Sequence, residues 1–96
     1  MHARLTTFNM GPGKRDVATS MADEALKMSK GMDGFVSATY LILDEAAGDY
    51  GSLTVWETED AANAAADTLK PWFADKLGPH TTAPPVFRIA EVYMPD

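Results

Sequence analysis

The chain has 96 residues, of which 46% are hydrophobic and 23% are charged, and these values are ordinary for one small globular domain. Its formal net charge is −6 at pH 7, and no basic cluster exceeds the pair Lys14 and Arg15, so we do not expect a nucleic-acid partner. The absence of cysteine excludes disulfides, thiolate nucleophiles and cysteine-based metal sites. No apolar run could cross a membrane and the N-terminus lacks a signal-peptide core, so we expect a cytoplasmic protein without a membrane partner.

The first part of the sequence predicts a strand followed by a helix. Residues 3–10 are rich in Thr, Leu and Phe, and the Gly-Pro-Gly sequence at 11–13 ends this strand, because proline cannot donate to a β-ladder. Apolar residues then recur at helical spacing, up to a glycine that marks the end of the helix. They are Val17, Met21, Ala25, Met28 and Met32. We interpret this stripe as a buried helix face, although a methionine stripe also suits an adaptable binding surface.

A hairpin and a second helix follow. Residues 35–43 and 50–57 are dense in aromatic and β-branched side chains, and the short turn between them predicts an antiparallel pair. Thr58 has the position of a helix N-cap. The helix that it begins has one apolar face, formed by Ala61, Ala65 and Leu69. Pro71 is expected to interrupt this helix and to leave a separate short helical piece at 72–77.

Residues 86–94 are the last predicted strand, so the order of elements is β-α-β-β-α-β. This order is typical of an α+β fold of the ferredoxin-like kind, with a four-stranded antiparallel sheet and two helices on one face. We expect residues 1–96 to form a single domain of this type.

Both faces of the predicted sheet are apolar. In the second strand, one face carries Phe35, Leu41 and Leu43, and the other carries Val36, Tyr40 and Ile42. The last strand shows the same feature. A sheet with helices on one face and water on the other should instead alternate apolar and polar residues. We therefore expect a second copy of the chain to cover the open face, which makes the protein a homodimer.

No conventional catalytic constellation is present in the sequence. The histidines, His2 and His80, are too few for a His-rich site, and no glycine-rich phosphate loop occurs. Asn9, at the end of the first strand, is unusual in a strand, although a turn residue accounts for it equally well. Trp56, near the end of the third strand, fits either a core position or a ligand contact. Arg88 in the last strand meets either solvent or an anionic ligand.

Three stretches carry a resemblance to a known family. They are residues 3–8 (ARLTTF), the pair Gly34 and Phe35, and residues 53–62 (LTVWETEDAA). On these residues the chain resembles the antibiotic biosynthesis monooxygenase family of the dimeric α+β barrel superfamily. The resemblance implies a homodimer in which two sheets pack into a barrel, with a ligand cavity between the helices and the sheet of each subunit.

The resemblance also implies a function, that of a monooxygenase that needs no metal or flavin and acts on a hydrophobic aromatic or quinone-type small molecule. Asn9 and Trp56 match two site positions of such enzymes, where Asn9 would donate to a developing oxyanion and Trp56 would bound the substrate. The residues expected to contact the substrate are Tyr40, Trp72, Phe73, His80 and Arg88. No cofactor is expected, because a carbanion flanked by aromatic carbonyl groups can pass an electron directly to O2.

Two other functions stay open. A non-catalytic dimer that binds a small molecule is the main alternative, because a fold does not decide an activity. The resemblance extends also to haem-degrading proteins, whose iron needs an axial histidine on the second helix. The corresponding region is alanine-rich at 64–66, and His80 lies in a loop beyond Pro71 and Gly78, which argues against haem degradation.

Overall fold

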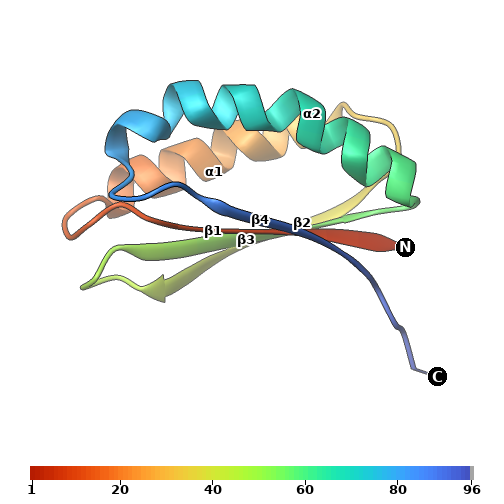
Figure 1. The fold of residues 1–96 in the computed structure, drawn as a ribbon, viewed down its shortest axis with the longest axis horizontal. Helices are drawn as coiled ribbons and strands as arrows, with labels where there is room; N and C mark the ends of the chain where they lie inside the picture. Colours follow the sequence, from red (N-terminus) through yellow and green to blue (C-terminus); the bar gives the residue numbers. More distant parts are fainter. Residues whose placement is uncertain (96) are drawn as a thin grey trace.

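The computed structural model describes residues 1–95 and has the predicted order of elements (Figure 1). The strands are β1 (His2–Asn9), β2 (Phe35–Asp44), β3 (Asp49–Trp56) and β4 (Val86–Glu91), and the helices are α1 (Arg15–Lys30), α2 (Glu59–Lys76) and the 3-10 helix η1 (Gly78–His80). The strands form one antiparallel sheet in the order β2-β3-β1-β4. Both α-helices cover the same face of this sheet, which confirms the predicted ferredoxin-like α+β fold. Neither helix of the described chain has the length and apolar composition of a membrane span.

Two local predictions are wrong. Pro71 does not interrupt the second helix, which runs unbroken from Glu59 to Lys76. Pro71 lies on the exposed side of α2, so only one backbone hydrogen bond is lost there, and the buried residues Leu69 and Phe73 on either side hold the helix to the sheet. Phe35 does not share a face with Leu41, because a register shift between Phe35 and Ser37 turns its ring toward Trp56 on the helix side.

The start of α2 is packed closely against the entry to β2. Gly34 has a φ of +80°, and a Cβ at this position would lie 2.6 Å from the Cβ of Ala61 in α2. Its carbonyl oxygen accepts a hydrogen bond from the Glu57 N–H at 2.8 Å. Thr58 is the N-cap, as predicted, because its Oγ1 accepts from the Ala61 N–H at 3.0 Å. Only glycine fits at position 34, and this contact sets where α2 crosses the sheet.

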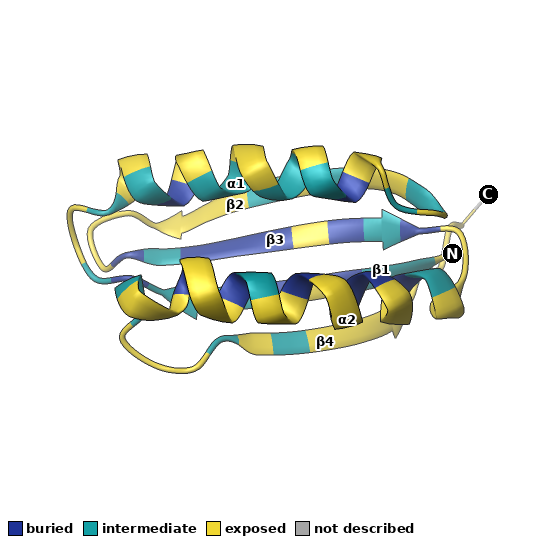
Figure 2. Ribbon diagram, turned by 90° about the horizontal axis from the view of Figure 1, so that it is seen from above, coloured by how far each residue is buried: buried dark blue, intermediate teal, exposed yellow. Residues whose placement is uncertain are grey.

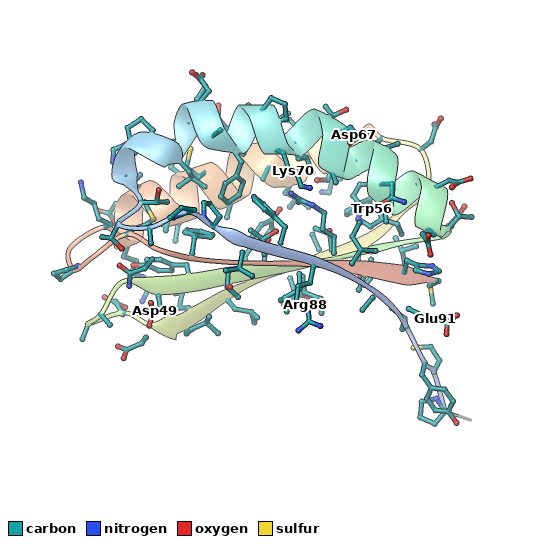
Figure 3. All side chains as sticks on the ribbon, viewed as in Figure 1. Asp49, Trp56, Asp67, Lys70, Arg88 and Glu91 are labelled. Atoms are coloured by element: carbon teal, nitrogen blue, oxygen red, sulfur yellow. The ribbon has the colours of Figure 1, made fainter. Side chains whose placement is uncertain are left out.

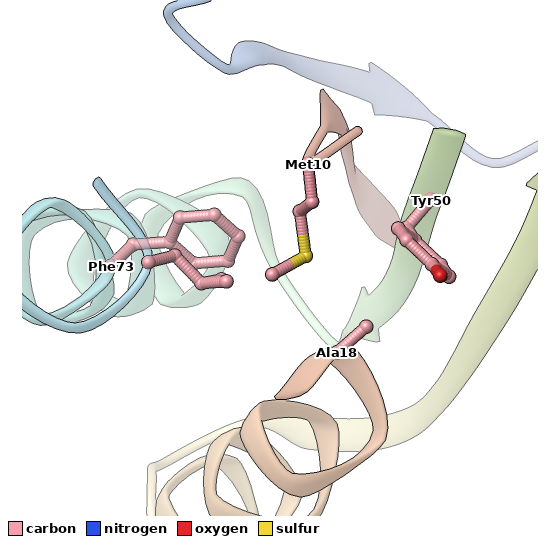
Figure 4. Packing of buried hydrophobic residues seen from close by; sticks show 5 residues of the cluster. Met10, Ala18, Tyr50 and Phe73 are labelled. Atoms are coloured by element: carbon pink, nitrogen blue, oxygen red, sulfur yellow. The ribbon is translucent and has the colours of Figure 1, made fainter. Parts of the chain in front are cut away.

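The core consists of two clusters at opposite ends of the helix layer. One is formed by Trp56, Ala62, Ala65 and Leu69, with the partly buried Met28, Met32, Phe35 and Ala61 packed against it. The other is formed by Met10, Ala18, Tyr50, Phe73 and Leu77. In this second cluster Met10 lies between Phe73 of α2 and Tyr50 of β3, with Ala18 of α1 below it (Figure 4). The predicted apolar face of α2 is therefore the buried one.

Each face of the sheet departs in part from the usual arrangement. Under the helices, the central strands present buried polar side chains, namely Arg4 and Thr6 of β1 and Ser52 and Thr54 of β3 (Figure 2). The open face instead carries Leu5, Leu41, Leu43, Leu53 and Val86, all of them exposed. We call these five residues the open-face patch. Buried polar side chains among the apolar ones on the covered face indicate that this side holds more than a packed core.

Trp56 provides a test of the first core cluster. Its side chain is 0% exposed, its ring lies edge-on to Phe35 at 5.5 Å between centroids, and its Nε1 donates to Thr54 Oγ1 at 2.9 Å. We expect Trp56→Ala to lower the free energy of unfolding by about 3–5 kcal/mol, because the helix above cannot collapse into the space left behind. Trp56→Phe should cost less, since it removes only part of the ring and one hydrogen bond. Chemical denaturation of both variants measures the difference, and near-native stability of Trp56→Ala would contradict this packing.

Candidate functional site

A cavity of ≈ 160 Å³ lies between the two helices and the sheet. Its floor is formed by β1, β2 and β3, one wall by α1 and the other by the second half of α2. The lining includes aromatic rings and polar side chains, among them Arg4, Phe8, Ser29, Tyr40, Tyr50, Trp72 and Phe73. The methionine stripe of α1 explains part of this space, because Met21 and Ala25 line the cavity and are only half buried. The stripe is therefore both a core face and a cavity wall.

One side of the cavity is aromatic. The Phe73 ring of α2 stands edge-on to Phe8 at 5.3 Å, to Phe87 at 5.9 Å and to Trp72 at 6.2 Å between centroids. Phe8 in turn lies 6.0 Å from Tyr50. Edge-to-face contacts of this kind hold each ring in one orientation. The wall is therefore a rigid apolar surface, suited to a flat unsaturated ligand.

Arg4 contributes a positive charge to the floor of this cavity. It is 3% exposed and is the one buried residue in the 1–95 range that carries a formal charge. Its Nε and Nη2 have no hydrogen-bond partner among the described residues, and neither of the ion pairs found there includes it. Its guanidinium lies 5.1 Å from the centre of the Phe87 ring. Burial lowers the pKa of Arg4, and the nearby Tyr40 acts in the opposite direction, but an arginine stays charged at neutral pH.

Three hydroxyl groups complete the polar side of the cavity. Ser29 Oγ of α1, Tyr40 Oη of β2 and Tyr50 Oη of β3 are all buried and have no hydrogen-bond partner within the described chain. Burial raises the pKa of the Tyr40 phenol; Arg4 opposes this rise and Asp23 adds to it. Tyr40 is therefore a neutral donor at physiological pH. Together with Arg4, these groups can donate several hydrogen bonds to an oxygen atom placed in the cavity.

The structure brings together three of the residues that the sequence singled out. Tyr40, Trp72 and Phe73 all line the cavity. His80 lies in η1 and Arg88 lies on the open face of β4, pointing away from the helices (Figure 3), and neither is a lining residue. Arg88 faces outward because its neighbour Phe87 packs under the helices, and successive residues of a strand point to opposite faces.

Asn9 and Trp56 do not line one cavity, which corrects the pairing that the sequence suggested. In the ladder between β1 and β3, Asn9 is opposite Asp49 while Trp56 is opposite His2, so the two lie at opposite ends of the sheet. Seven residues along a strand separate these ends by about 23 Å. Trp56 is enclosed in the first core cluster, and neither residue is among those lining the cavity.

The Asn9 side chain is fully occupied by the loops around it. Its Nδ2 donates to the Ala47 carbonyl at 2.9 Å and to Asp49 Oδ1 at 2.6 Å. Its Oδ1 accepts from the Gly11 N–H at 3.0 Å and from Thr82 Oγ1 at 2.7 Å. Two donors and two lone pairs are all that a side-chain amide has. Asn9 therefore joins three loops at one end of the sheet, with no donor left for an oxyanion.

The residues that sequence reasoning missed are Arg4, Ser29 and Tyr50. A signal for Arg4 was present, because alternation in the first strand places His2, Arg4, Thr6 and Phe8 on one face, and Phe8 marks that face as the covered one. Ser29 and Tyr50 carry no comparable signal in the sequence. As for metals, no three side chains of His, Cys, Asp or Glu gather as a metal site would need in the described part of the chain.

Comparisons with known proteins show a similarity in fold to solved structures. No protein-family model matches the chain, and no curated protein does. Among solved structures, the chain is similar to SnoaB, a cofactor-independent oxygenase from Streptomyces nogalater (mutant N63A), with a TM-score of 0.76, 19% identity and coverage of 98% of this chain and 94% of that one. It is also similar to the ActVA-Orf6 monooxygenase of Streptomyces coelicolor in complex with nanaomycin D, with a TM-score of 0.73, 21% identity and coverage of 99% and 92%.

A third structure, of an antibiotic biosynthesis monooxygenase, matches with a TM-score of 0.72 at 10% identity and covers 98% of this chain and 100% of that one. The matches extend over nearly the whole of each chain, so they concern the complete fold and not one motif. The protein therefore has the fold of the antibiotic biosynthesis monooxygenases.

The protonation of Tyr40 can be tested directly. Because burial raises its pKa, the folded protein should hold this phenol proton above the ordinary value of about 10. A raised pKa in the folded state means that the contribution of Tyr40 to stability is present below about pH 10 and is lost as the pH rises through the folded pKa. An ultraviolet titration should therefore show one tyrosine that ionises late.

Two variants identify this late component. Tyr40→Phe should remove it, while Tyr93→Phe, which alters a tyrosine that is exposed, should leave it in place. If the late component survives in Tyr40→Phe, the phenol is not the buried donor that the cavity geometry indicates.

Proposed function

We propose that the protein is a monooxygenase that needs no cofactor and acts on a hydrophobic aromatic or quinone-type small molecule. One observation carries this proposal, namely that a cluster of edge-to-face aromatic rings and a set of buried, unpartnered donors line the same cavity. The wall suits the flat carbon skeleton of such a substrate, and the donors suit the oxygen atom on which its negative charge develops. The similarity to SnoaB, a cofactor-independent oxygenase, supports the same reaction class.

The reaction needs little from the protein beyond this environment. A substrate CH2 group flanked by aromatic carbonyl groups loses a proton, and the resulting carbanion is delocalised onto an oxygen atom. One electron passes to O2, the two radicals combine to a peroxide, and loss of water leaves a carbonyl. The balance is CH2 + O2 → C=O + H2O, so the substrate supplies all the electrons and no external reductant is required.

The side chains of the cavity have distinct parts in this proposal. Arg4 and the Tyr40 hydroxyl stabilise the negative charge that develops on the substrate oxygen, which lowers the pKa of the adjacent C–H. No carboxylate or imidazole is among the lining residues, so solvent takes up the proton. Trp72 and Phe73 hold the ring system in place. Asn9 and Trp56 support the site from the two ends of the sheet and do not touch the substrate.

The homodimer belongs to this proposal. The open-face patch consists of five exposed apolar side chains on the face away from the helices, with Arg88 of β4 beside Leu5, and a second copy of the same sheet would bury all five. Leu5 and Leu53 are direct neighbours in the ladder at its centre. A barrel of two sheets would also stiffen the floor of each cavity. A binding module without catalysis is the second candidate, because the same cavity could hold an aromatic ligand unchanged.

Oxygen uptake decides between catalysis and binding. An oxygen electrode records consumption with a panel of hydroquinones and hydroxylated anthrones, in the presence of a metal chelator. We expect at least one member to react, with one O2 consumed per product and no accumulation of hydrogen peroxide. Tyr40→Phe should slow the reaction by about 10²–10³, the scale for losing one donor to an oxyanion.

The matched control is Tyr93→Phe, which removes a hydroxyl group from an exposed tyrosine beyond β4. Its rate should equal that of the wild type. A wild-type protein that binds a panel member tightly, yet consumes no oxygen with any of them, would establish the binding module instead.

The dimer is tested by a charge in the centre of the open-face patch. We expect the wild type to be dimeric by light scattering at micromolar concentration, and Leu53→Lys to dissociate, because burying an unpaired ammonium between two sheets is costly. Ala64→Lys is the control, since it adds the same charge to the exposed side of α2 and should stay dimeric. A wild type that is monomeric and well folded would refute the interface.

A further inference from the structure

The guanidinium of Arg4 is buried, and in the proposed function it is only one hydrogen-bond donor among several. The chain as a whole is acidic, with 14 Asp and Glu against 8 Lys and Arg. Yet no carboxylate pairs with this arginine within residues 1–95, although a buried arginine normally has such a partner. Lys70 is a second cation close by, since its Nζ lies 5.4 Å from the same Phe87 ring. The local charge is therefore positive in a protein that is negative overall.

A buried charge without a partner is costly, so the site is incomplete with protein atoms alone. Two nitrogens of the guanidinium fork, Nε and Nη2, are both unpaired, and this edge presents two parallel N–H groups. The geometry that satisfies such an edge is a group with two oxygen atoms sharing one negative charge. The hydroxyls of Tyr40 and Tyr50 also line the cavity and can donate to the outer lone pairs of those oxygens.

The size of the cavity limits what the rest of the ligand can be. At ≈ 160 Å³ it is close to the 150 Å³ of an apolar cavity known to accept benzene. One aromatic ring therefore fits between the Trp72 and Phe73 wall and the sheet, while a larger ring system would have to extend beyond the cavity. The aromatic wall and the guanidinium act on different parts of the same ligand.

From these observations we propose that the cavity selects small planar aromatic anions that present two neighbouring oxygens, at least one of them carrying the negative charge, to the Nε–Nη2 edge of Arg4. Two ligand classes share this chemistry, the aromatic carboxylates and the ionised hydroxyquinones. The inference deepens the proposed function, on which it rests for the fate of the ligand, but the binding itself does not require oxygen.

The experiment compares ligands that differ only in charge, under nitrogen, by calorimetry and by thermal shift. The pairs are 2,5-dihydroxybenzoate with its methyl ester, and 2-hydroxy-1,4-naphthoquinone, which is ionised at neutral pH, with its methyl ether. We expect at least one anion to bind ten-fold or more tightly than its neutral partner, and to raise the melting temperature where the neutral partner does not. The pair that shows the preference tells carboxylate from hydroxyquinone.

Variants assign the preference to Arg4. Arg4→Met should abolish the difference between anion and neutral partner, and Arg4→Lys should keep only part of it, because an ammonium lacks the two-pronged edge. Arg15→Met is the control, since Arg15 is exposed at the start of α1 and pairs with Glu45 outside the cavity. Removal of the unpaired charge should leave the melting temperature of Arg4→Met equal to or above that of the wild type.

Two results would overturn the inference. If the wild type binds each neutral partner as tightly as its anion, water in the cavity solvates Arg4 sufficiently and no anion is selected; this comparison needs no variant to fold. If Arg4→Met folds and keeps the preference, another group provides it. Neither result depends on oxygen uptake, so a protein that selects anions but consumes no oxygen would refute the proposed reaction alone.

Discussion

The placement of a charged residue under the helices constrains most of this structure. Strand residues alternate between faces, so burying Arg4 on the covered side of β1 sends Leu5 to the open side. The same alternation in β3 puts Ser52 and Thr54 under the helices and Leu53 on the open face. One choice of strand phase thus creates both the polar floor of a cavity and an apolar surface that needs cover. The two halves of the proposed function, a ligand site and a dimer, have the same origin.

The cavity also lowers the stability of the fold when no ligand is bound. A guanidinium without a counter-ion and several hydroxyls without partners would be replaced by apolar side chains if stability alone mattered. The core compensates at its two ends, where Trp56 packs on the alanines of α2 and where Phe73 closes against Met10 and Tyr50. Between these ends α1 stays half buried above the cavity. The second cluster shares Ala18, Tyr50, Phe73 and Leu77 with the cavity lining, so its packing also shapes the cavity.

The sequence was sufficient for the fold because local signals and the period of apolar residues agree in every element. Thr58 is the N-cap of α2, Gly31 ends α1, and the methionine stripe marks the inner face of α1. The helix break predicted at Pro71 was wrong, because a proline on the exposed side of a well-packed helix lowers the stability of the helix too little to break it. The face predicted for Phe35 was wrong for another reason. A bulge in the strand pairing shifts the alternation of the side chains, and no residue in the sequence indicates it.

The site was harder to predict than the fold. Tyr40, Trp72 and Phe73 were among the residues expected to contact a substrate, and all three line the cavity. Arg4 was not found, because a lone arginine in a strand is usually a surface residue, although its alternation with Phe8 in the first strand indicated the covered face. Asn9 and Trp56 were paired by resemblance alone, and only the register of β1 against β3 shows how far apart they are.

The amide of Asn9 joins the loop after β1, the turn between β2 and β3, and the loop before β4 through a single side chain. These three connections are far apart in the sequence, so nothing local prevents each from changing length independently. In the folded protein all three are hydrogen-bonded to the Asn9 side chain, so an insertion in any one of them would disturb the bonds to the other two. The lengths of these three connections are therefore coupled through Asn9, whereas the link between α1 and β2 at the opposite end of the sheet is constrained separately, by the contact of Gly34 with α2.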